Sequence, residues 1–209
     1  MNILLINASP HKKGASARVV SELWDSFDAL GDTTIELDIG IEARSACTAC
    51  GGCKGGGGCI IGDLGEFASA VESANGIIFV TPTYYGGAVG SLTALLSRLL
   101  YSEKRHFLYK PVATVGIGRR GCISSAVDQV NRFFHFTSSP IVTSGYPPIV
   151  YAVDSASAER DAEGLQNVRS LARNMHWLAK CIERGGSDGI SPPEPEAKIS
   201  IDIPSLSRR

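Results

Sequence analysis

The stretch GIIFVTPTYYGG, residues 76–87, carries the strongest signal for the fold class. Its first six residues are almost wholly apolar, which predicts a short strand buried on both faces. The Pro-Thr-Tyr-Tyr-Gly-Gly that follows predicts a loop at the carboxyl end of that strand. Similar runs on either side predict four further strands, at residues 2–7, 33–39, 112–118 and 140–143.

Segments with helical spacing of apolar residues alternate with these runs. Helices are predicted to begin near Ser16, at Asp63, where Glu66 completes an apparent capping box, and at Ser91. Another is expected over 127–134, and a last one runs from Leu165 to Gly185-Gly186. The alternation predicts a flavodoxin-like, doubly wound α/β fold: a five-stranded parallel sheet in the order 2-1-3-4-5 with helices on both faces.

The domain organisation follows from the same pattern. Residues 1–186 are expected to form one domain, with a glycine- and cysteine-rich insert at 40–62. Residues 187–209 are rich in proline and then alternate apolar and polar residues, with the apolar positions at Ile199, Ile201 and Ile203. This tail is predicted to be an extended arm, lying either on a neighbouring subunit or on its own domain.

Charge and hydropathy exclude several classes of partner. The 209 residues carry 20 Lys and Arg against 21 Asp and Glu, so a nucleic acid or an anionic membrane is a poor partner. No apolar run approaches the ~20 residues of a membrane helix, and the start of the chain does not resemble a signal peptide. We therefore expect a cytoplasmic protein with neither a nucleic acid nor a membrane partner.

In this fold class, ligands bind beyond the carboxyl ends of the strands. The loop at 8–16 ends at a helix start, and its free amides with the hydroxyls of Ser9 and Ser16 suit a phosphate. A plain connection with Ser16 as the N-cap is the alternative. In the loop at 82–87, backbone amides and aromatic rings suit a flat flavin ring, and the alternative is a surface turn whose tyrosines pack on the domain.

A third loop contains the pattern G-x-G-x-x-G over residues 116–121. It does not follow the first strand, and no acidic residue stands where a dinucleotide fingerprint requires one, so we interpret it as a glycine-rich edge beside the flavin. Arg119 and Arg120 either meet a nucleotide phosphate or form a solvated basic loop.

Four of the six cysteines, Cys47, Cys50, Cys53 and Cys59, lie within thirteen residues. The first three can bind three corners of one cubane iron–sulfur cluster, and Cys59 follows a flexible run of glycines that lets it supply the fourth. A zinc site and free or oxidised thiols are the alternatives. Cys122 and Cys181 stand alone and are expected to be buried structural thiols, although Cys122 lies close enough to the third loop to be reactive.

Taken in order, these motifs resemble a known family. Ser9-Pro10-x3-Gly14-x-Ser16, followed by Pro82-x-Tyr84-Tyr85-Gly86, is similar to the NADPH-dependent FMN reductases, and the cysteine cluster resembles that of the iron–sulfur flavoproteins. The resemblance covers roughly residues 1–145. It implies an FMN-dependent oxidoreductase that transfers electrons between NAD(P)H or a protein donor and a small-molecule or protein acceptor.

The resemblance also implies which residues bind each cofactor. The FMN phosphate would be held by Ser9, His11, Ala15 and Ser16, with His11 standing where the family often has arginine. The flavin ring would lie against Gly118 and against Pro82, Thr83, Tyr84, Tyr85, Gly86 and Gly87. A 4Fe–4S cluster on Cys47, Cys50, Cys53 and Cys59 would lie close enough to exchange electrons with FMN.

Because the cofactors carry the reaction, no side chain is predicted to be catalytic. The resemblance further implies a homodimer or homotetramer in which a neighbour covers the exposed ring face. Two other functions remain open at this point: a cluster-free NAD(P)H-dependent FMN or quinone reductase, and a non-enzymatic electron carrier or zinc-stabilised module.

Overall fold

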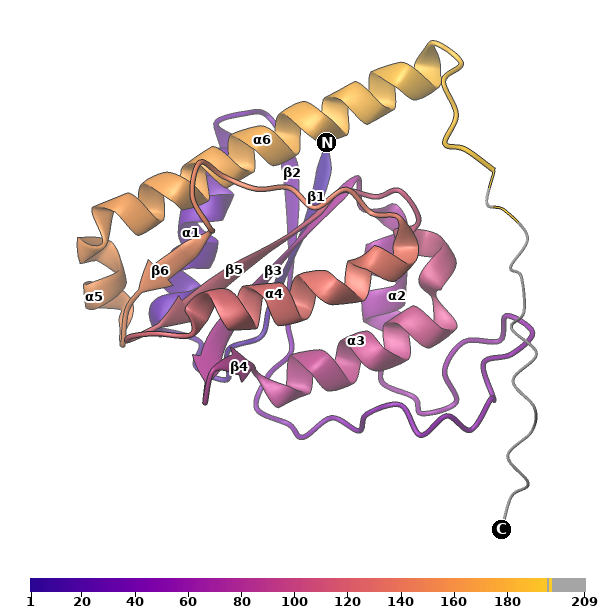
Figure 1. Ribbon diagram of the computed structural model, residues 1–209, viewed down its shortest axis with the longest axis horizontal. Coiled ribbons are helices and arrows are strands. Elements are labelled where there is room, and N and C mark those ends of the chain that lie inside the picture. Colours follow the sequence, from indigo (N-terminus) through magenta and orange to yellow (C-terminus); the bar gives the residue numbers. More distant parts are fainter. Residues whose placement is uncertain (195, 197–209) are drawn as a thin grey trace.

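The computed structural model describes residues 1–194 and 196, and its centre is a parallel sheet with helices on both faces (Figure 1). Five strands follow one another across the sheet: β2 (Thr33–Asp38), β1 (Asn2–Asn7), β3 (Gly76–Tyr84), β5 (Val112–Gly118) and β6 (Ile149–Tyr151). The short β4 (Gly87–Ala88) only pairs back on the end of β3. The flavodoxin-like fold and the order 2-1-3-4-5 of its five parallel strands are therefore confirmed.

The helices divide between the two faces of the sheet (Figure 1). One face is covered by α1 (Ala15–Asp28), α5 (Ser155–Arg160) and α6 (Ala162–Ser187). The other is covered by α2 (Gly65–Ser73), α3 (Gly90–Ser102) and α4 (Ile123–Phe134), with the 3-10 turns η1 (Lys104–Phe107) and η2 (His135–Thr137) at their ends.

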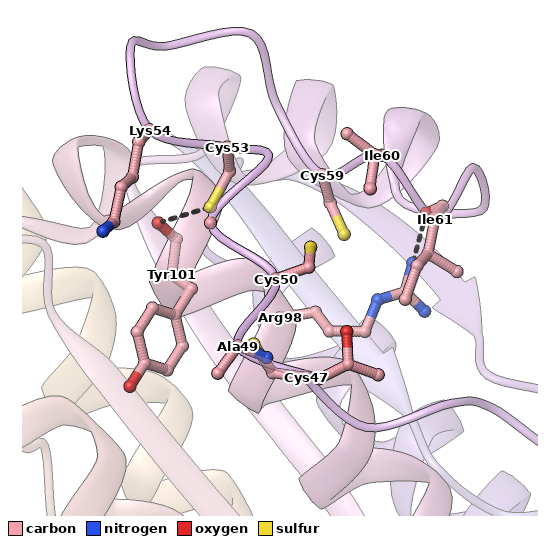
Figure 2. Close-up of a pocket in the computed structure, with 12 residues that line it drawn as sticks. Cys47, Ala49, Cys50, Cys53, Lys54, Cys59, Ile60, Ile61, Arg98 and Tyr101 are labelled. Carbon is pink, nitrogen blue, oxygen red and sulfur yellow. Dashed lines mark hydrogen bonds between the residues drawn. The ribbon is translucent and has the colours of Figure 1, made fainter. Parts of the chain in front are cut away.

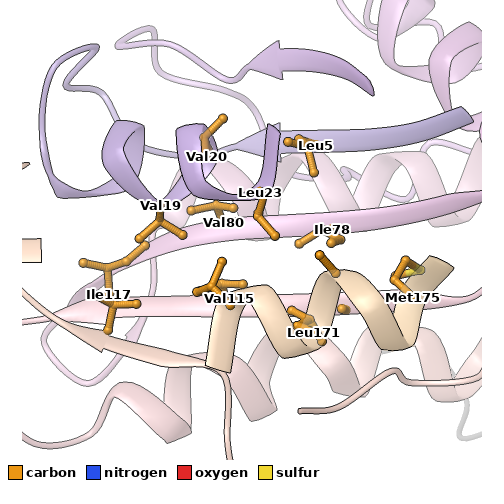
Figure 3. Packing of buried hydrophobic residues seen from close by; sticks show 14 of the residues in the cluster. Leu5, Val19, Val20, Leu23, Ile78, Val80, Val115, Ile117, Leu171 and Met175 are labelled. Carbon is orange, nitrogen blue, oxygen red and sulfur yellow. The ribbon is translucent and has the colours of Figure 1, made fainter. Parts of the chain in front are cut away.

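Successive side chains of the central strands point to opposite faces of the sheet, so a separate hydrophobic core forms on each face. Ile78 and Val80 of β3 face α1 and α6, where Leu23 and Met175 meet them (Figure 3). The intervening Phe79 faces the opposite layer and stacks on Phe134 of α4 at 5.1 Å between ring centroids. All these side chains are fully buried, and each contributes roughly 1.5–3 kcal/mol of transfer free energy to the fold.

The predicted strand at 140–143 is wrong. Ile141 makes only an isolated bridge to Val112, and the fifth strand is β6, which pairs with the end of β5 from Gly116 onward. Pro140 has no amide hydrogen to donate to a ladder, and only two hydrogen bonds join this segment to β5. The Val112 amide donates to the Pro140 carbonyl at 3.0 Å, and the Val142 amide donates to the Val112 carbonyl at 2.8 Å.

Two predicted helix ends also differ from the structure. The α2 helix begins at Gly65 with Leu64 as its N-cap, because the Asp63 carboxylate binds two arginines instead of capping the helix. The last helix continues through both glycines to Ser187.

Cys122 and Cys181 are exposed, so the prediction of buried structural thiols is wrong for both. The buried face of α6 ends at Ala179, and the helix then runs past the edge of the sheet, which leaves Cys181 in solvent (Figure 1). Cys122 is the N-cap of α4 and has a left-handed backbone with φ of 67°.

The beginning of the predicted arm contacts the domain. The Tyr109 hydroxyl donates a 2.9 Å hydrogen bond to the carbonyl of Pro193. Ile199, Ile201 and Ile203 lie outside the described residues. Across 1–194 and 196, we find no helix with the length and apolar character needed to cross a bilayer.

Candidate cofactor sites

A cavity of about 360 Å³ lies at the carboxyl edge of the sheet, where β1, β3 and β5 end and the chain leaves β6. This volume falls within the range of about 300–1,000 Å³ that small-molecule sites occupy. We call it the sheet-edge cavity; its lining residues are Ser9, His11, Gly14, Ala15, Ser16, Pro82, Thr83, Tyr84, Ile117, Gly118, Arg119, Ala152, Val153 and Asp154.

One end of the sheet-edge cavity is the start of α1. Its N-cap is Gly14 in an extended conformation, and no side chain of the described residues caps the helix, which leaves its first amides available to donate. Ser16 lies within the helix and is 3% exposed, so the alternative that Ser16 is the N-cap is wrong. A helix start with free amides, the hydroxyls of Ser9 and Ser16 and the positive end of the helix dipole suits an anion such as phosphate.

The end of β3 forms another wall of this cavity. The Thr83 hydroxyl is buried there without a hydrogen-bond partner among the described residues, and Tyr84 lines the cavity half-exposed. Tyr85 and Gly86 form the tip of the β3–β4 hairpin with φ of 51° and 83°, the positive values of a type I′ turn. Tyr85 is fully exposed, so it does not pack on the domain as the surface-turn alternative requires.

The structure thus brings together eight of the eleven residues that sequence analysis predicted around FMN. Those at the sheet-edge cavity are Ser9, His11, Ala15, Ser16, Pro82, Thr83, Tyr84 and Gly118. Tyr85, Gly86 and Gly87 lie beside it in the hairpin rather than on its wall. That these residues bind FMN stays a prediction.

The glycines of the third loop have a packing role. A Cβ on Gly116 would lie 2.7 Å from Ile123 Cγ2, and one on Gly118 would lie 2.9 Å from Ile123 Cγ1. These two glycines let α4 approach β5 closely, which accounts for the first half of the G-x-G-x-x-G pattern. Arg119, by contrast, lies on the wall of the sheet-edge cavity.

Sequence analysis missed the wall that follows β6, formed by Ala152, Val153 and Asp154. Hydrogen bonds from the Ser157 hydroxyl and amide lower the pKa of Asp154, which is the N-cap of α5 in a capping box. The Asp154-x-x-Ser157 spacing was a usable signal. With the fifth strand predicted at 140–143 instead of at 149–151, this capping box does not follow a strand end in the sequence pattern.

A second cavity, of about 310 Å³, lies beside the carboxyl-terminal half of α3. We call it the cysteine cavity, because all four clustered cysteines line it and all four are free thiols. They come from the segment 39–64, which has no helix or strand. Its lining is Cys47, Thr48, Ala49, Cys50, Gly51, Cys53, Lys54, Cys59, Ile60, Ile61, Arg98 and Tyr101.

The four thiols differ in their local contacts. Figure 2 shows the sulfurs of Cys50 and Cys59 pointing toward the same space. The Cys53 thiol donates to the Tyr101 carbonyl at 3.6 Å, and the Cys47 sulfur accepts from the Ala49 amide at 3.4 Å. Within the part of the chain that the structure describes, no three Cys, His, Asp or Glu side chains converge closely enough to hold a single metal ion.

The backbone of this segment is closely fitted around Cys50. Hydrogen bonds from the Gly52 amide and then from Thr48 lower the pKa of the Cys50 thiol. A Cβ on Gly52 would lie 2.6 Å from Cγ2 of Ile60, so a larger residue there would have to displace the exposed Ile60 side chain.

Arg98 of α3 forms the floor of the cysteine cavity (Figure 2). It is 1% exposed, and its guanidinium donates to the Asp63 carboxylate and to the Ile61 carbonyl. Burial lowers the pKa of Arg98, but Asp63 and then Cys59 raise it by more, so the net shift is upward. Sequence analysis missed this residue; the signal was a single arginine within the leucine-rich stretch 92–100.

Helix α3 lines the cysteine cavity and begins near the sheet-edge cavity. The α3 helix begins at Gly90, next to the hairpin that flanks the sheet-edge cavity, and Arg98 lies two turns further on. At 1.5 Å of rise per residue, Gly90 and Arg98 are roughly 12 Å apart along the axis of α3. That a cluster and a flavin in these cavities exchange electrons stays a prediction.

The parallel sheet with helices on both faces defines a flavodoxin-like protein, and the start of α1 at the sheet-edge cavity suits a phosphate-bearing ligand. The chain belongs to the NADPH-dependent FMN reductase family, whose sequence profile matches residues 1–154. It is therefore a flavin-dependent oxidoreductase, as the motifs predicted, and the alternative of a non-enzymatic module is set aside.

Similar proteins include an iron-sulfur flavoprotein of Methanocaldococcus jannaschii, 27% identical over 88% of this chain and 100% of the relative. An iron-sulfur flavoprotein of Methanosarcina thermophila is 25% identical over 88% of this chain and 98% of its own length. Among solved structures, a WrbA-like flavodoxin from Agrobacterium tumefaciens has the same fold, with a TM-score of 0.60, 15% identity and coverage of 86% and 98%.

Proposed function

We propose that this protein transfers electrons between NAD(P)H or a protein donor and an acceptor, through FMN bound in the sheet-edge cavity and a 4Fe–4S cluster bound in the cysteine cavity. The observation that carries the proposal is the presence, in one chain of this reductase family, of two separate cavities with different donors. One offers backbone amides and hydroxyls, and the other offers four free thiols.

The residues of the sheet-edge cavity fit FMN. The α1 amides and the hydroxyls of Ser9 and Ser16 would donate hydrogen bonds to its phosphate. The buried Thr83 hydroxyl, which has no hydrogen-bond partner among residues 1–194 and 196, would pair with a polar atom of the ring and so be satisfied. When bound, FMN supplies hydride acceptance and electron transfer in steps of one or two electrons.

The donor set and the size of the cysteine cavity fit a cluster. Thiolates are the usual ligands of iron–sulfur clusters, and Cys47, Cys50, Cys53 and Cys59 all line the same space. Its volume of about 310 Å³ is roughly ten times the share of one water molecule in the liquid, so a group larger than a single ion has room. The names of both relatives from methanogens support the same assignment. When bound, a 4Fe–4S cluster supplies one-electron transfer.

The proposal extends to assembly and location. Tyr85 and Phe136 are exposed aromatics, and Gly86 and Phe136 line a common hollow beside the hairpin. Exposed aromatics of this kind support a homodimer or homotetramer. Six free thiols support a reducing, cytoplasmic location. Sedimentation would test the assembly, and a species with the mass of one chain would contradict it.

The function is tested by purifying the protein without oxygen and recording its visible spectrum, its iron and flavin content and its oxidation of NAD(P)H. We expect bound FMN, iron and NAD(P)H-dependent reduction of an added acceptor. A cluster-free FMN or quinone reductase is the second candidate, and the partners that the Cys47 and Cys53 sulfurs already have within the protein favour it. Turnover with FMN but without iron would establish that second candidate.

A further inference from the structure

Arg98 presents an unusual combination of burial and incomplete hydrogen bonding. A guanidinium that is 1% exposed is costly unless its donors are satisfied. Nη2 donates to Asp63 and Ile61, and Nη1 lies 3.5 Å from the Ser45 carbonyl. Among the described residues nothing accepts from its Nε–H, which is fully buried. A buried donor without an acceptor calls for a physical reason.

The surroundings of Arg98 indicate where the missing acceptor belongs. The side chain lines the cysteine cavity together with the four thiols, and Figure 2 shows it crossing the floor of that cavity next to Cys47 and below Cys59. The acceptor-rich neighbours in this space are sulfurs. A thiolate-bound cluster has sulfur atoms that accept hydrogen bonds. Among the described residues no sulfur accepts from Nε, although Cys59 lies near enough to raise the pKa of Arg98.

Arg44 provides an internal comparison. It also binds Asp63, at 2.8 Å, and its Nε is also buried, with no hydrogen-bond partner in the part of the chain that the structure describes. However, its guanidinium lies over the ring of Phe67, 5.0 Å from the centroid, and Arg44 does not line the cysteine cavity. The ring face attracts the Arg44 cation, whereas Arg98 borders a space lined by thiols.

We propose that Arg98 is a positioning residue for the iron–sulfur cluster, whose Nε–H donates a hydrogen bond to a cluster or cysteine sulfur and whose charge favours the reduced cluster. This inference rests on the cluster in the proposed function. A cluster held by four thiolates is an anion, and reduction adds one more negative charge. A fixed cation in a buried site stabilises the more negative state, and hydrogen bonds to the sulfurs act in the same direction.

The test is a redox titration of the anaerobically prepared holoprotein, followed through the spectroscopic signal of the reduced cluster. Arg98→Met removes the charge and the donors, and it should reduce the equilibrium constant for one-electron reduction at least tenfold, which is 59 mV toward lower potential. Arg98→Lys keeps the charge and loses the Nε donor, so a shift in the same direction but smaller is expected.

The matched control is Arg44→Met, which removes the other arginine of Asp63 and should change the equilibrium constant less than threefold. The FMN potential should not change in any of these variants. An Arg98→Met protein with full iron and an unchanged cluster potential would overturn the inference and leave the proposed function intact. Wild-type protein that binds no iron would overturn both.

A second measurement uses the wild-type protein and so does not depend on whether Arg98 variants fold. With 15N-labelled arginine, the reduced cluster should show a magnetic coupling to one guanidinium nitrogen. The coupling should persist in Arg44→Met. A wild-type cluster without any such coupling would contradict the hydrogen bond from Nε.

Discussion

The two cavities of this protein are built in opposite ways. The sheet-edge cavity is made where three strands of the sheet end, where α1 begins and where the chain leaves β6, so the fold itself places its backbone donors. The cysteine cavity is made by the segment 39–64, which has no helix or strand. Side-chain contacts hold that segment in place. Arg98 and Arg44 bind Asp63. The Ser97 hydroxyl accepts a 3.1 Å hydrogen bond from the Cys47 amide. The fold itself positions the sheet-edge cavity, whereas the cysteine cavity depends on a few side-chain contacts.

The largest effect is expected from Ser16→Glu. The new carboxylate would lie at the start of α1, where it would repel a phosphate and fill the space of a side chain that is 3% exposed. FMN affinity should fall at least about 100-fold, or roughly 3 kcal/mol, while iron content stays unchanged. Equilibrium titration with FMN measures this, and Ser16→Ala, which removes only the hydroxyl, should lose about tenfold or less.

Retention of FMN with unchanged affinity in Ser16→Glu would contradict the phosphate assignment. FAD in the purified wild-type protein would also contradict the assignment of FMN.

Substitution of the clustered cysteines should have the opposite effect, loss of iron with retention of flavin. Serine at position 47, 50, 53 or 59 replaces a thiolate ligand and should remove most of the iron, while flavin content stays near the wild-type value. Cys122→Ser and Cys181→Ser are the controls, because both residues lie outside the cysteine cavity and should keep iron and flavin alike. Full iron content in Cys50→Ser would count against the proposed set of ligands.

Thr83→Val tests whether the Thr83 hydroxyl in the sheet-edge cavity contributes to FMN binding or to the stability of the fold. Valine keeps the shape of threonine but removes a buried hydroxyl that has no partner among the described residues. FMN affinity should fall about tenfold, while the free energy of unfolding of the flavin-free protein should stay equal or rise by about 1 kcal/mol. Denaturation with and without FMN measures both quantities, and a less stable flavin-free protein would show that the hydroxyl has a partner within the fold.

The smallest effect concerns two carboxylates that each lie between two arginines. Glu22 binds Arg18 of α1, at 2.7 Å, and Arg169 of α6, so it joins helices of the main fold. Asp63 binds Arg98 of α3 and Arg44, which belongs to the same segment 39–64 as Asp63. These ion pairs therefore hold only the cysteine segment in place. Glu22→Gln should lower global stability by about 1–2 kcal/mol, whereas Asp63→Asn should only increase hydrogen exchange in the segment 39–64.

The Glu22 contribution should depend on pH. Burial raises the pKa of Glu22, but hydrogen bonds from Arg169 and Arg18 lower it by more, so its net shift is below the usual 4.5. The unfolded chain then binds more protons than the folded one as pH falls below about 4.5. The Glu22 stabilisation should be complete above that pH and be lost on further acidification, and Glu22→Gln should flatten this part of a plot of stability against pH. Identical slopes in both proteins would contradict the ion-pair account.

The difference between the two cavities also explains which parts of the structure the sequence predicted. Strand order and the sheet-edge loops were predictable, because apolar runs such as 76–81 specify buried strands and the fold then brings their ends together. The cysteines were recognised from their spacing. Arg98 was not, because its role depends on Asp63 and on carbonyls that a long segment brings to α3. Tyr85 was assigned to the flavin wall because the turn geometry that exposes it appears only once the β3–β4 pairing is known.

The most direct test of two independent cofactor sites is the joint analysis of flavin, iron and zinc in anaerobically prepared wild-type protein and Cys50→Ser. The account predicts about one FMN and about four iron ions per chain in the wild type, and the same FMN with little iron in the variant. Flavin without iron in the wild type, or zinc in its place, would contradict it.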